Sequence, residues 1–123
     1  MPEGDTVHKL ARYLRPRLVG TRVGEVRIGF RDTSMLSGRR IAAVQAHGKH
    51  LLLEFDNDWS LRSHLGLHGT WHRYAHDERW KKPERQAAIV MTTDEEVLVC
   101  FNAKEVEILR SRGLGARALA ARP

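Results

Sequence analysis

The sequence predicts a mostly β domain of the α+β class, a two-sheet β-sandwich with an N-terminal helix and a short C-terminal helix. Three observations lead to this expectation. Apolar residues follow a helical period of about 3.6 over residues 3–18, and after Gly20 the period falls to about 2. Turn-forming residues separate the later segments, and 123 residues are enough for one core but not for two.

The first predicted element is an amphipathic helix over residues 3–18. Its apolar face has members three and four residues apart, namely Val7, Leu10, Ala11, Leu14 and Leu18. Asp5 and Thr6 offer capping oxygens near the start. Pro16 has no amide hydrogen, so we expect the helix to end or kink there.

Strands are expected along the rest of the chain. The first strand region is irregular and contains Val23, Val26 and Ile28, with Gly24 as a candidate bulge. Further strands are expected at residues 39–46, 49–55, 59–65, 70–74, 86–92 and 96–101. Residues 56–58 and 93–95 are typical of hairpin turns and residues 75–85 of a polar loop. The last short helix is expected from Ala103 to about Arg110.

Composition excludes several classes of protein. A hydrophobic fraction of 41% is too high for a disordered chain, and no apolar run approaches the ~18 residues that cross a bilayer. The first residues lack the apolar stretch of a signal peptide, so we expect an intracellular location, cytoplasmic or at the nucleoid, and no membrane partner. Cys100 is the only cysteine, which excludes an internal disulfide and a multi-cysteine zinc site in this chain.

The net charge of +6 is unevenly distributed. Residues 1–50 hold 10 Lys and Arg against 4 Asp and Glu, whereas residues 51–123 hold 11 against 11. A basic half beside a neutral half favours a polyanionic partner, with nucleic acid first. A solvated Arg-rich surface explains the charge equally well.

Three segments carry a resemblance to a known family. The chain opens with Met1-Pro2-Glu3-Gly4, residues 47–53 read His-Gly-Lys-His-Leu-Leu-Leu, and residues 61–71 read Leu-Arg-Ser-His-Leu-Gly-Leu-His-Gly-Thr-Trp. Each segment is weak alone, but all three stand in the family's order. With them the chain resembles the N-terminal catalytic domain of an Fpg/Nei (formamidopyrimidine-glycosylase/endonuclease VIII) DNA glycosylase/AP lyase, in particular the endonuclease VIII-like branch.

The resemblance implies that Pro2 is the nucleophile and that Glu3 handles protons at the sugar. The amine of a terminal proline is partly neutral near pH 7, and the positive end of a helix dipole disfavours its protonation. Attack on deoxyribose C1′ expels the base and leaves an iminium, from which elimination cuts the strand. This requires removal of Met1. Taken alone, a proline followed by an acid is also an ordinary helix start.

The resemblance also implies DNA contacts in the two other segments. Lys49 would bind the phosphate beside the lesion and assist catalysis, and His64 would face the DNA. Leu67 would enter the duplex and offset the stacking lost on base flipping, with Gly66 and His68 beside it in the gap. On the residues alone, Lys49 is also consistent with a surface lysine and Leu67 with a core residue, although the glycines at 66 and 69 favour an exposed loop tip.

Histidines recur every four residues, at His64, His68, His72 and His76. On a helix this spacing gathers metal ligands on one face. The intervening glycines and the β pattern of residues 70–74 argue against a helix, and four residues of strand span roughly 13 Å, too far to share one ion. We predict no metal site and no cofactor in this chain.

Residues 1–112 are expected to form this domain, and residues 113–123 to begin an interdomain linker. Complete members of the family continue into a helix–two-turn–helix domain and usually a zinc finger, which these 123 residues do not include. Thr6 stands where many members have a second glutamate, and residues 102–107 lack the Arg-Arg-Phe-Gly element of the 8-oxoguanine branch.

Two classes of function follow. The first is a monomeric bifunctional DNA glycosylase/AP lyase of base-excision repair. It would remove oxidised bases, chiefly pyrimidines, from damaged double-stranded DNA and cleave abasic sites by β/δ elimination. The second is a non-catalytic DNA- or protein-binding β-domain, inactive alone because the second half of the enzyme is missing.

Overall fold

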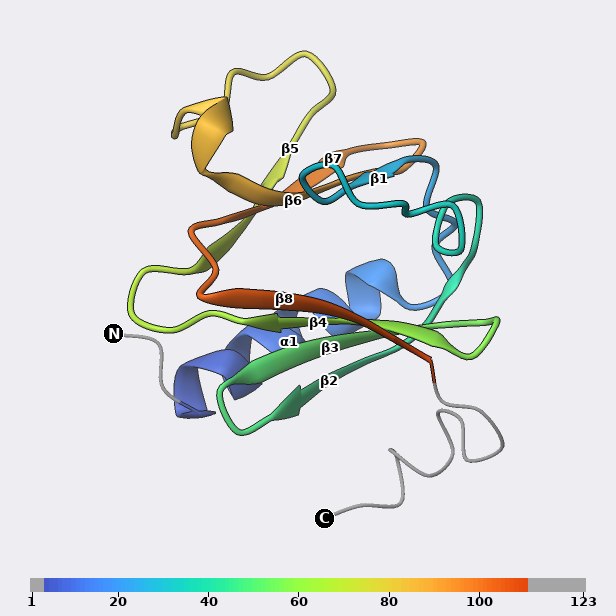
Figure 1. Ribbon diagram of the computed structural model, residues 1–123, viewed down its shortest axis with the longest axis horizontal. Coiled ribbons are helices and arrows are strands. Elements are labelled where there is room, and N and C mark those ends of the chain that lie inside the picture. Colours follow the sequence, from blue (N-terminus) through green and yellow to red (C-terminus); the bar gives the residue numbers. More distant parts are fainter. Residues whose placement is uncertain (1–3, 111–123) are drawn as a thin grey trace.

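Two antiparallel sheets face each other across one core (Figure 1). The computed structural model describes residues 4–110, so Pro2, Glu3 and the expected linker at 113–123 lie outside the described residues. The first sheet contains, in order, β1 (Val26–Arg27), β6 (Ala87–Thr92), β7 (Val97–Phe101) and β5 (Thr70–Tyr74). The second contains β2 (Ile41–His47), β3 (His50–Phe55), β4 (Trp59–His64) and β8 (Glu105–Arg110). The predicted two-sheet sandwich is confirmed.

The helix α1 (Gly4–Leu18) packs against β2. Its predicted apolar face is buried, with Val7, Ala11, Leu14 and Leu18 each at most 2% exposed. Pro16 lies inside α1 and does not end it. Pro16 has no N–H to donate to the Arg12 carbonyl, and the helix continues for only two more residues, to the fully buried Leu18. The Arg15 side chain donates a hydrogen bond to the Val44 carbonyl over 2.9 Å and ties α1 to β2.

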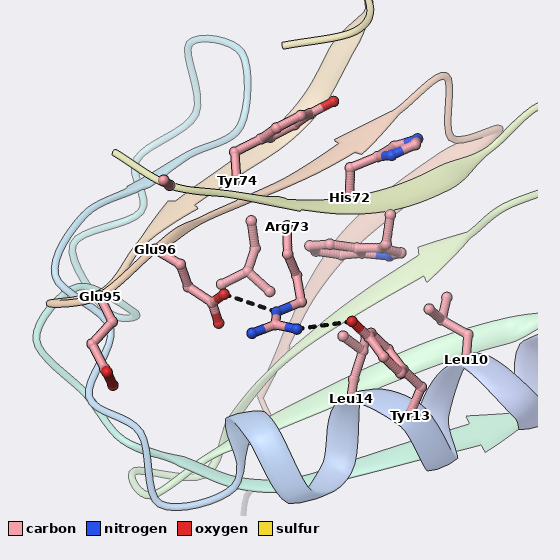
Figure 2. A pocket seen from close by; sticks show the side chains of 11 residues that line it. Leu10, Tyr13, Leu14, His72, Arg73, Tyr74, Glu95 and Glu96 are labelled. Atoms are coloured by element: carbon pink, nitrogen blue, oxygen red, sulfur yellow. Dashed lines mark hydrogen bonds and ion pairs between the residues drawn. The ribbon is translucent and has the colours of Figure 1, made fainter. Parts of the chain in front are cut away.

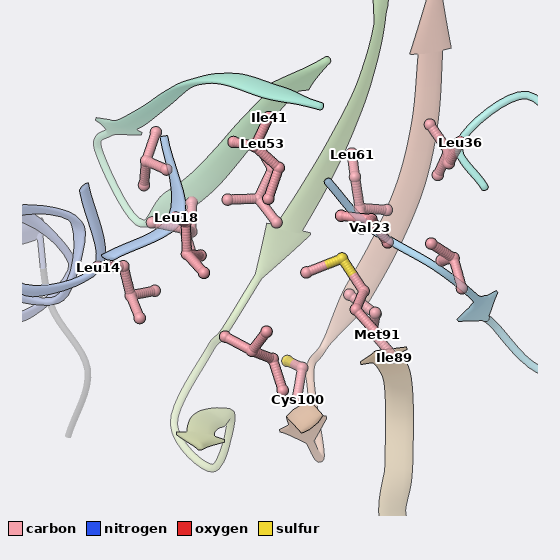
Figure 3. Close-up of a cluster of buried hydrophobic side chains, with 14 of the residues drawn as sticks. Leu14, Leu18, Val23, Leu36, Ile41, Leu53, Leu61, Ile89, Met91 and Cys100 are labelled. Carbon is pink, nitrogen blue, oxygen red and sulfur yellow. The ribbon is translucent and has the colours of Figure 1, made fainter. Parts of the chain in front are cut away.

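The main core lies between the sheets and under α1 (Figure 3). The largest fully enclosed side chains of this core come from both sheets, from α1 and from the loop before β2: Phe55, Leu14, Leu18, Leu36, Ile41, Leu51, Leu53, Leu61, Ile89, Met91 and Leu98. Cys100 is fully buried there, and burial raises the pKa of its thiol to about 12. On the opposite face of β7, Val99 and Phe101 belong to a smaller cluster that Trp80 covers from the loop after β5.

The expected C-terminal helix is wrong, because these residues form β8. Ala103, Lys104 and the glutamates favour a helix locally. The tertiary structure overrides that preference, because β4 presents an open edge above the core and β8 pairs with it along its whole length. Val106 then lies opposite Ser63 and Ile108 opposite Leu61, which turns both apolar side chains toward the core.

The other strands begin and end within two residues of the predicted positions. The irregular first region forms only β1, and Gly24 before it donates its N–H to the Thr92 carbonyl over 2.7 Å. Residues 56–58 and 93–95 lie in hairpin turns as expected, with Asp58 at a positive φ of 68°. The loop 75–86 includes a short 3-10 helix, η1 (Glu84–Gln86). Among the described residues no helix is both long and apolar enough to cross a membrane.

The chain crosses between the sheets at two places that matter for the site. Residues 65–69 connect β4 to β5, and residues 102–104 connect β7 to β8. Both connections lie at the same end of the sandwich, on the left in Figure 1. The Lys104 N–H donates a hydrogen bond to the His64 carbonyl over 2.8 Å. This bond joins the end of the connection 102–104 to the residue that precedes the connection 65–69.

Candidate nucleic-acid interface

One pocket of about 490 Å³ brings together the predicted site residues that the structure describes. It is lined by Lys49, His64, Leu65, Gly66, Leu67, His68, Asn102 and Lys104. The predicted nucleophile Pro2 and its neighbour Glu3 lie outside the described residues. The lining contains two lysines and two histidines and, among the described residues, no acid. An anion is therefore the ligand that its charge favours.

Lys49 lies in the tight turn that joins β2 to β3. His47 and His50 pair across the hairpin, which leaves Gly48 and Lys49 as a two-residue turn. Gly48 has a φ of +60°, whereas Lys49 is not among the residues with positive φ, the pattern of a type II′ turn. Lys49 is exposed, and the short turn fixes where its backbone lies at the rim of the pocket.

The connection 65–69 holds Leu67 away from the core. The Gly69 N–H donates to the Leu65 carbonyl over 2.9 Å, and a Cβ at Gly69 would lie only 2.4 Å from that oxygen. Gly66 has a φ of +66° and lies against the Lys104 side chain. A Cβ added at Gly66 would lie 3.1 Å from the Cβ of Lys104. Leu67 is 59% exposed at the tip, so it is not a core residue.

Behind Lys49, histidines form a row across the end of the second sheet. The registers place His47 beside His50, His50 beside His64, and His64 beside Glu105. The rings of His50 and His64 have centroids 4.4 Å apart. Desolvation lowers the pKa of His50, and the neighbouring His64 and Arg62 lower it further, against the smaller opposing effect of Glu105. His50 is therefore neutral at pH 7, and its buried Nδ1 has no hydrogen-bond partner among the described residues.

The four regularly spaced histidines do not converge. His64 ends β4 and His68 lies in the connection to β5. His72 packs edge-on against Phe101, and His76 contacts the Asp94 carbonyl at 3.2 Å in the next loop. Within residues 4–110 there is no group of three or more His, Cys, Asp or Glu side chains arranged for a metal ion.

The structure adds Asn102 and Lys104, which the sequence reasoning missed. Both lie in the connection before β8, in or beside the stretch that sequence assigns to a helix. One local signal for the end of the strand was Asn102 directly after it, because asparagine tolerates the left-handed backbone conformation that often ends a strand. Asn102 has a φ of 56°.

Another pocket, of about 550 Å³, lies between α1 and β5 and contains none of the predicted site residues (Figure 2). Its cation Arg73 is already engaged: Nε donates to Glu96 and a terminal nitrogen donates to the Tyr13 hydroxyl, each over 2.8 Å. These bonds join the helix to the edge of the first sheet. We therefore assign this pocket a structural role.

Comparison with known proteins identifies relatives along nearly the whole chain. Residues 1–107 match the family described as the formamidopyrimidine-DNA glycosylase N-terminal domain. A protein of Streptomyces coelicolor named probable endonuclease 8 2 is 35% identical over 115 residues, which cover 90% of this chain and 41% of that protein. Endonuclease 8 of Escherichia coli is 29% identical over 118 residues, 93% of this chain and 44% of that protein.

A solved structure shares the fold. The formamidopyrimidine-DNA glycosylase of Lactococcus lactis, non-covalently bound to DNA containing an AP site, superposes with a TM-score of 0.78 at 20% identity. The match covers 96% of this chain and 48% of that one. The chain thus spans less than half the length of the relatives it matches.

Proposed function

This chain belongs to the formamidopyrimidine-DNA glycosylase N-terminal domain family, and from that premise we propose that it is the catalytic half of a DNA glycosylase/AP lyase of base-excision repair. The observation that carries the proposal is the pocket in which Lys49, His64 and Leu67 meet. These three residues come from segments up to 18 positions apart, yet one cation-rich surface presents them together.

The proposed reaction begins at Pro2 after removal of Met1. The free secondary amine attacks C1′ of the damaged nucleotide, the N-glycosidic bond breaks, and the base leaves with a proton. Glu3 handles protons at the sugar ring as the ring opens to an iminium. Loss of a C2′ proton then expels the 3′ phosphate, and a second elimination expels the 5′ phosphate.

The described residues supply binding and positioning for these steps. Lys49 offers an exposed ammonium to the phosphate beside the lesion, and His64 lies behind it on β4. Leu67 enters the base stack in place of the flipped nucleotide, which offsets an unstacking cost of a few kcal/mol. The route needs no metal or cofactor in this chain, because an amine supplies the nucleophile.

The proposed substrate is an oxidised base, chiefly a pyrimidine, or an abasic site in double-stranded DNA. The two relatives named endonuclease 8 support this choice. The second candidate function is a non-catalytic binding domain. The cation-rich pocket supports that candidate as well, because binding a phosphate there requires no chemistry at Pro2.

Borohydride trapping distinguishes the two functions. Protein with Met1 removed is mixed with a duplex that contains an abasic site, and borohydride reduces any iminium to a stable protein–DNA adduct. We expect an adduct that is lost in Pro2→Gly and in protein that retains Met1. Absence of an adduct at high protein concentration, with DNA still bound, would establish the binding-only function.

A further inference from the structure

A carboxylic acid that the proposed reaction does not use is buried in the second sheet. Leu53 and Phe55 belong to the core, so Glu54 between them lies on the opposite face of β3, where it is 1% exposed. Desolvation raises the pKa of Glu54, against the smaller opposing effect of a hydrogen bond from Gln45. Glu54 Oε2 accepts that bond over 2.6 Å, and Oε1 has no hydrogen-bond partner among the described residues. A buried carboxylate with one hydrogen bond costs stability, so packing alone does not account for an acid at this position.

Gln45 connects this acid to a histidine at the end of β2. Its Oε1 lies 3.1 Å from His47 Nε2. An ionised carboxylate has no hydrogen to donate, so Glu54 draws the NH₂ group of Gln45 toward itself and turns the amide oxygen toward His47. His47 Nε2 then carries a hydrogen and donates it to that oxygen. The other ring nitrogen, Nδ1, is left for a ligand.

His47 lies at the same end of the sheet as the residues proposed to bind DNA. It is opposite His50 in the pairing of β2 with β3, and His50 is opposite His64, which lines the pocket with Lys49. Opposite residues of antiparallel strands share a face, so His47 continues that surface, and it is half-buried rather than enclosed. Besides Glu54, the charged or titratable side chains on this face and in the adjoining turn are Lys49, His50, Arg62, His64, Glu105 and Glu107. Because Arg62 forms an ion pair with Glu107, the histidines decide how much positive charge this face adds to that of Lys49.

We propose that His47 binds a backbone phosphate of the DNA next to the phosphate assigned to Lys49, an inference that rests on the proposed function. Glu54, acting through Gln45, is the residue that positions His47 for this contact. A phosphate accepts hydrogen bonds, and Nδ1 of a neutral ring whose hydrogen is on Nε2 only accepts as well. His47 therefore binds the phosphate when Nδ1 takes up a proton from solvent, and the cationic ring then donates to the phosphate and to Gln45. Binding at this position is coupled to the uptake of one proton.

The pH dependence of DNA binding tests this coupling. The dissociation constant is measured at pH 6 and at pH 8 for a duplex that contains a non-cleavable abasic analogue. We expect His47→Gln to weaken binding about tenfold at pH 6 and less than about twofold at pH 8. In Glu54→Gln the new amide both donates and accepts, so Gln45 can turn over and His47 can carry its hydrogen on Nδ1. A neutral ring then donates to the phosphate, and we expect the ratio of the two dissociation constants to fall about threefold below that of wild type.

Glu107→Gln is the matched control, because it also removes one carboxylate from this face but one that is bound to Arg62. It should leave the ratio unchanged. In a His47→Gln background, Glu54→Gln should change the ratio no further, because Glu54 acts through His47. Nitrogen-15 NMR of the histidine rings gives a second readout: in wild type at pH 8, His47 should carry its hydrogen on Nε2. A ratio that Glu54→Gln leaves unchanged, or a wild-type ring with its hydrogen on Nδ1, would overturn the proposal.

Borohydride trapping at an abasic site is measured in parallel, so that this proposal and the proposed function can fail separately. If no adduct forms but binding still depends on pH through His47 and Glu54, the glycosylase proposal fails and this one stands. If an adduct forms and both variants bind DNA as wild type does, this one alone fails. If wild-type protein does not bind the duplex, both fail.

Discussion

Truncation of Leu67 separates the proposed DNA-contacting role of the connection 65–69 from its structural role. Leu67 is 59% exposed, so insertion into the base stack buries a little over half of its side chain. Complete burial of a leucine contributes about 1.5–3 kcal/mol, and the inserted part therefore about 1–2 kcal/mol. We expect Leu67→Ala to slow single-turnover excision from a lesion duplex about five- to thirtyfold. Stability should change by no more than ~0.5 kcal/mol, because the side chain fills no part of the core.

The assay uses two substrates and one control variant. A single-stranded abasic oligonucleotide needs no base flipping, so its trapping rate should be unaffected by Leu67→Ala. The control is Val19→Ala, another exposed apolar side chain, 44% exposed and directly after α1. It should leave both substrates unaffected. Equal slowing of both substrates by Leu67→Ala, or a loss of more than ~1 kcal/mol in urea unfolding, would refute the reasoning.

Four further substitutions test the fold beneath the site. Gly69→Ala should cost ~1–3 kcal/mol in urea unfolding and reduce excision, because the new Cβ overlaps the Leu65 backbone. Gly20→Ala is the control, because Gly20 has a φ of +88° but open space around it. It should lower stability without reducing excision. An equal loss of excision in Gly20→Ala and Gly69→Ala would contradict the argument. Burial raises the pKa of Glu54 above 4.5, so its ionisation costs stability as the pH rises through that raised value. Glu54→Gln should therefore unfold at a higher temperature than wild type at pH 7 and at a similar one near pH 4, and parallel pH profiles would contradict this. Leu14→Ala should cost ~2–5 kcal/mol in urea unfolding, and a loss below ~1 kcal/mol would show that the helix is loosely packed.

The features that sequence predicted well are those with a local physical cause. The face of α1 follows from the spacing of its apolar residues, and the strand ends follow from alternation and turn residues. The exposed position of Leu67 was also accessible, because the glycines at 66 and 69 mark a tight connection. One boundary was wrong: the strand expected at residues 49–55 begins at His50, and Lys49 lies in the turn before it.

The features that sequence missed depend on partners distant in the chain. Residues 105–110 favour a helix until the open edge of β4 is present, and only the folded sandwich supplies that edge. For the same reason Asn102 and Lys104 were not expected at the site. Their position follows from the hydrogen bond between Lys104 and His64, 40 residues apart, which no local pattern reveals.

The backbone of the connection 65–69 is fixed by different residues from those that it exposes, so the exposed side chains can change in evolution without loss of the fold. Its shape depends on glycine backbone, on the bond from Gly69 to Leu65 and on contact with Lys104. The side chains at Leu67 and His68 are exposed and contribute little to that shape. Selection can therefore exchange these two side chains, large for small or apolar for polar, while the scaffold stays folded. We expect a library randomised at positions 67 and 68 alone to keep nearly constant stability.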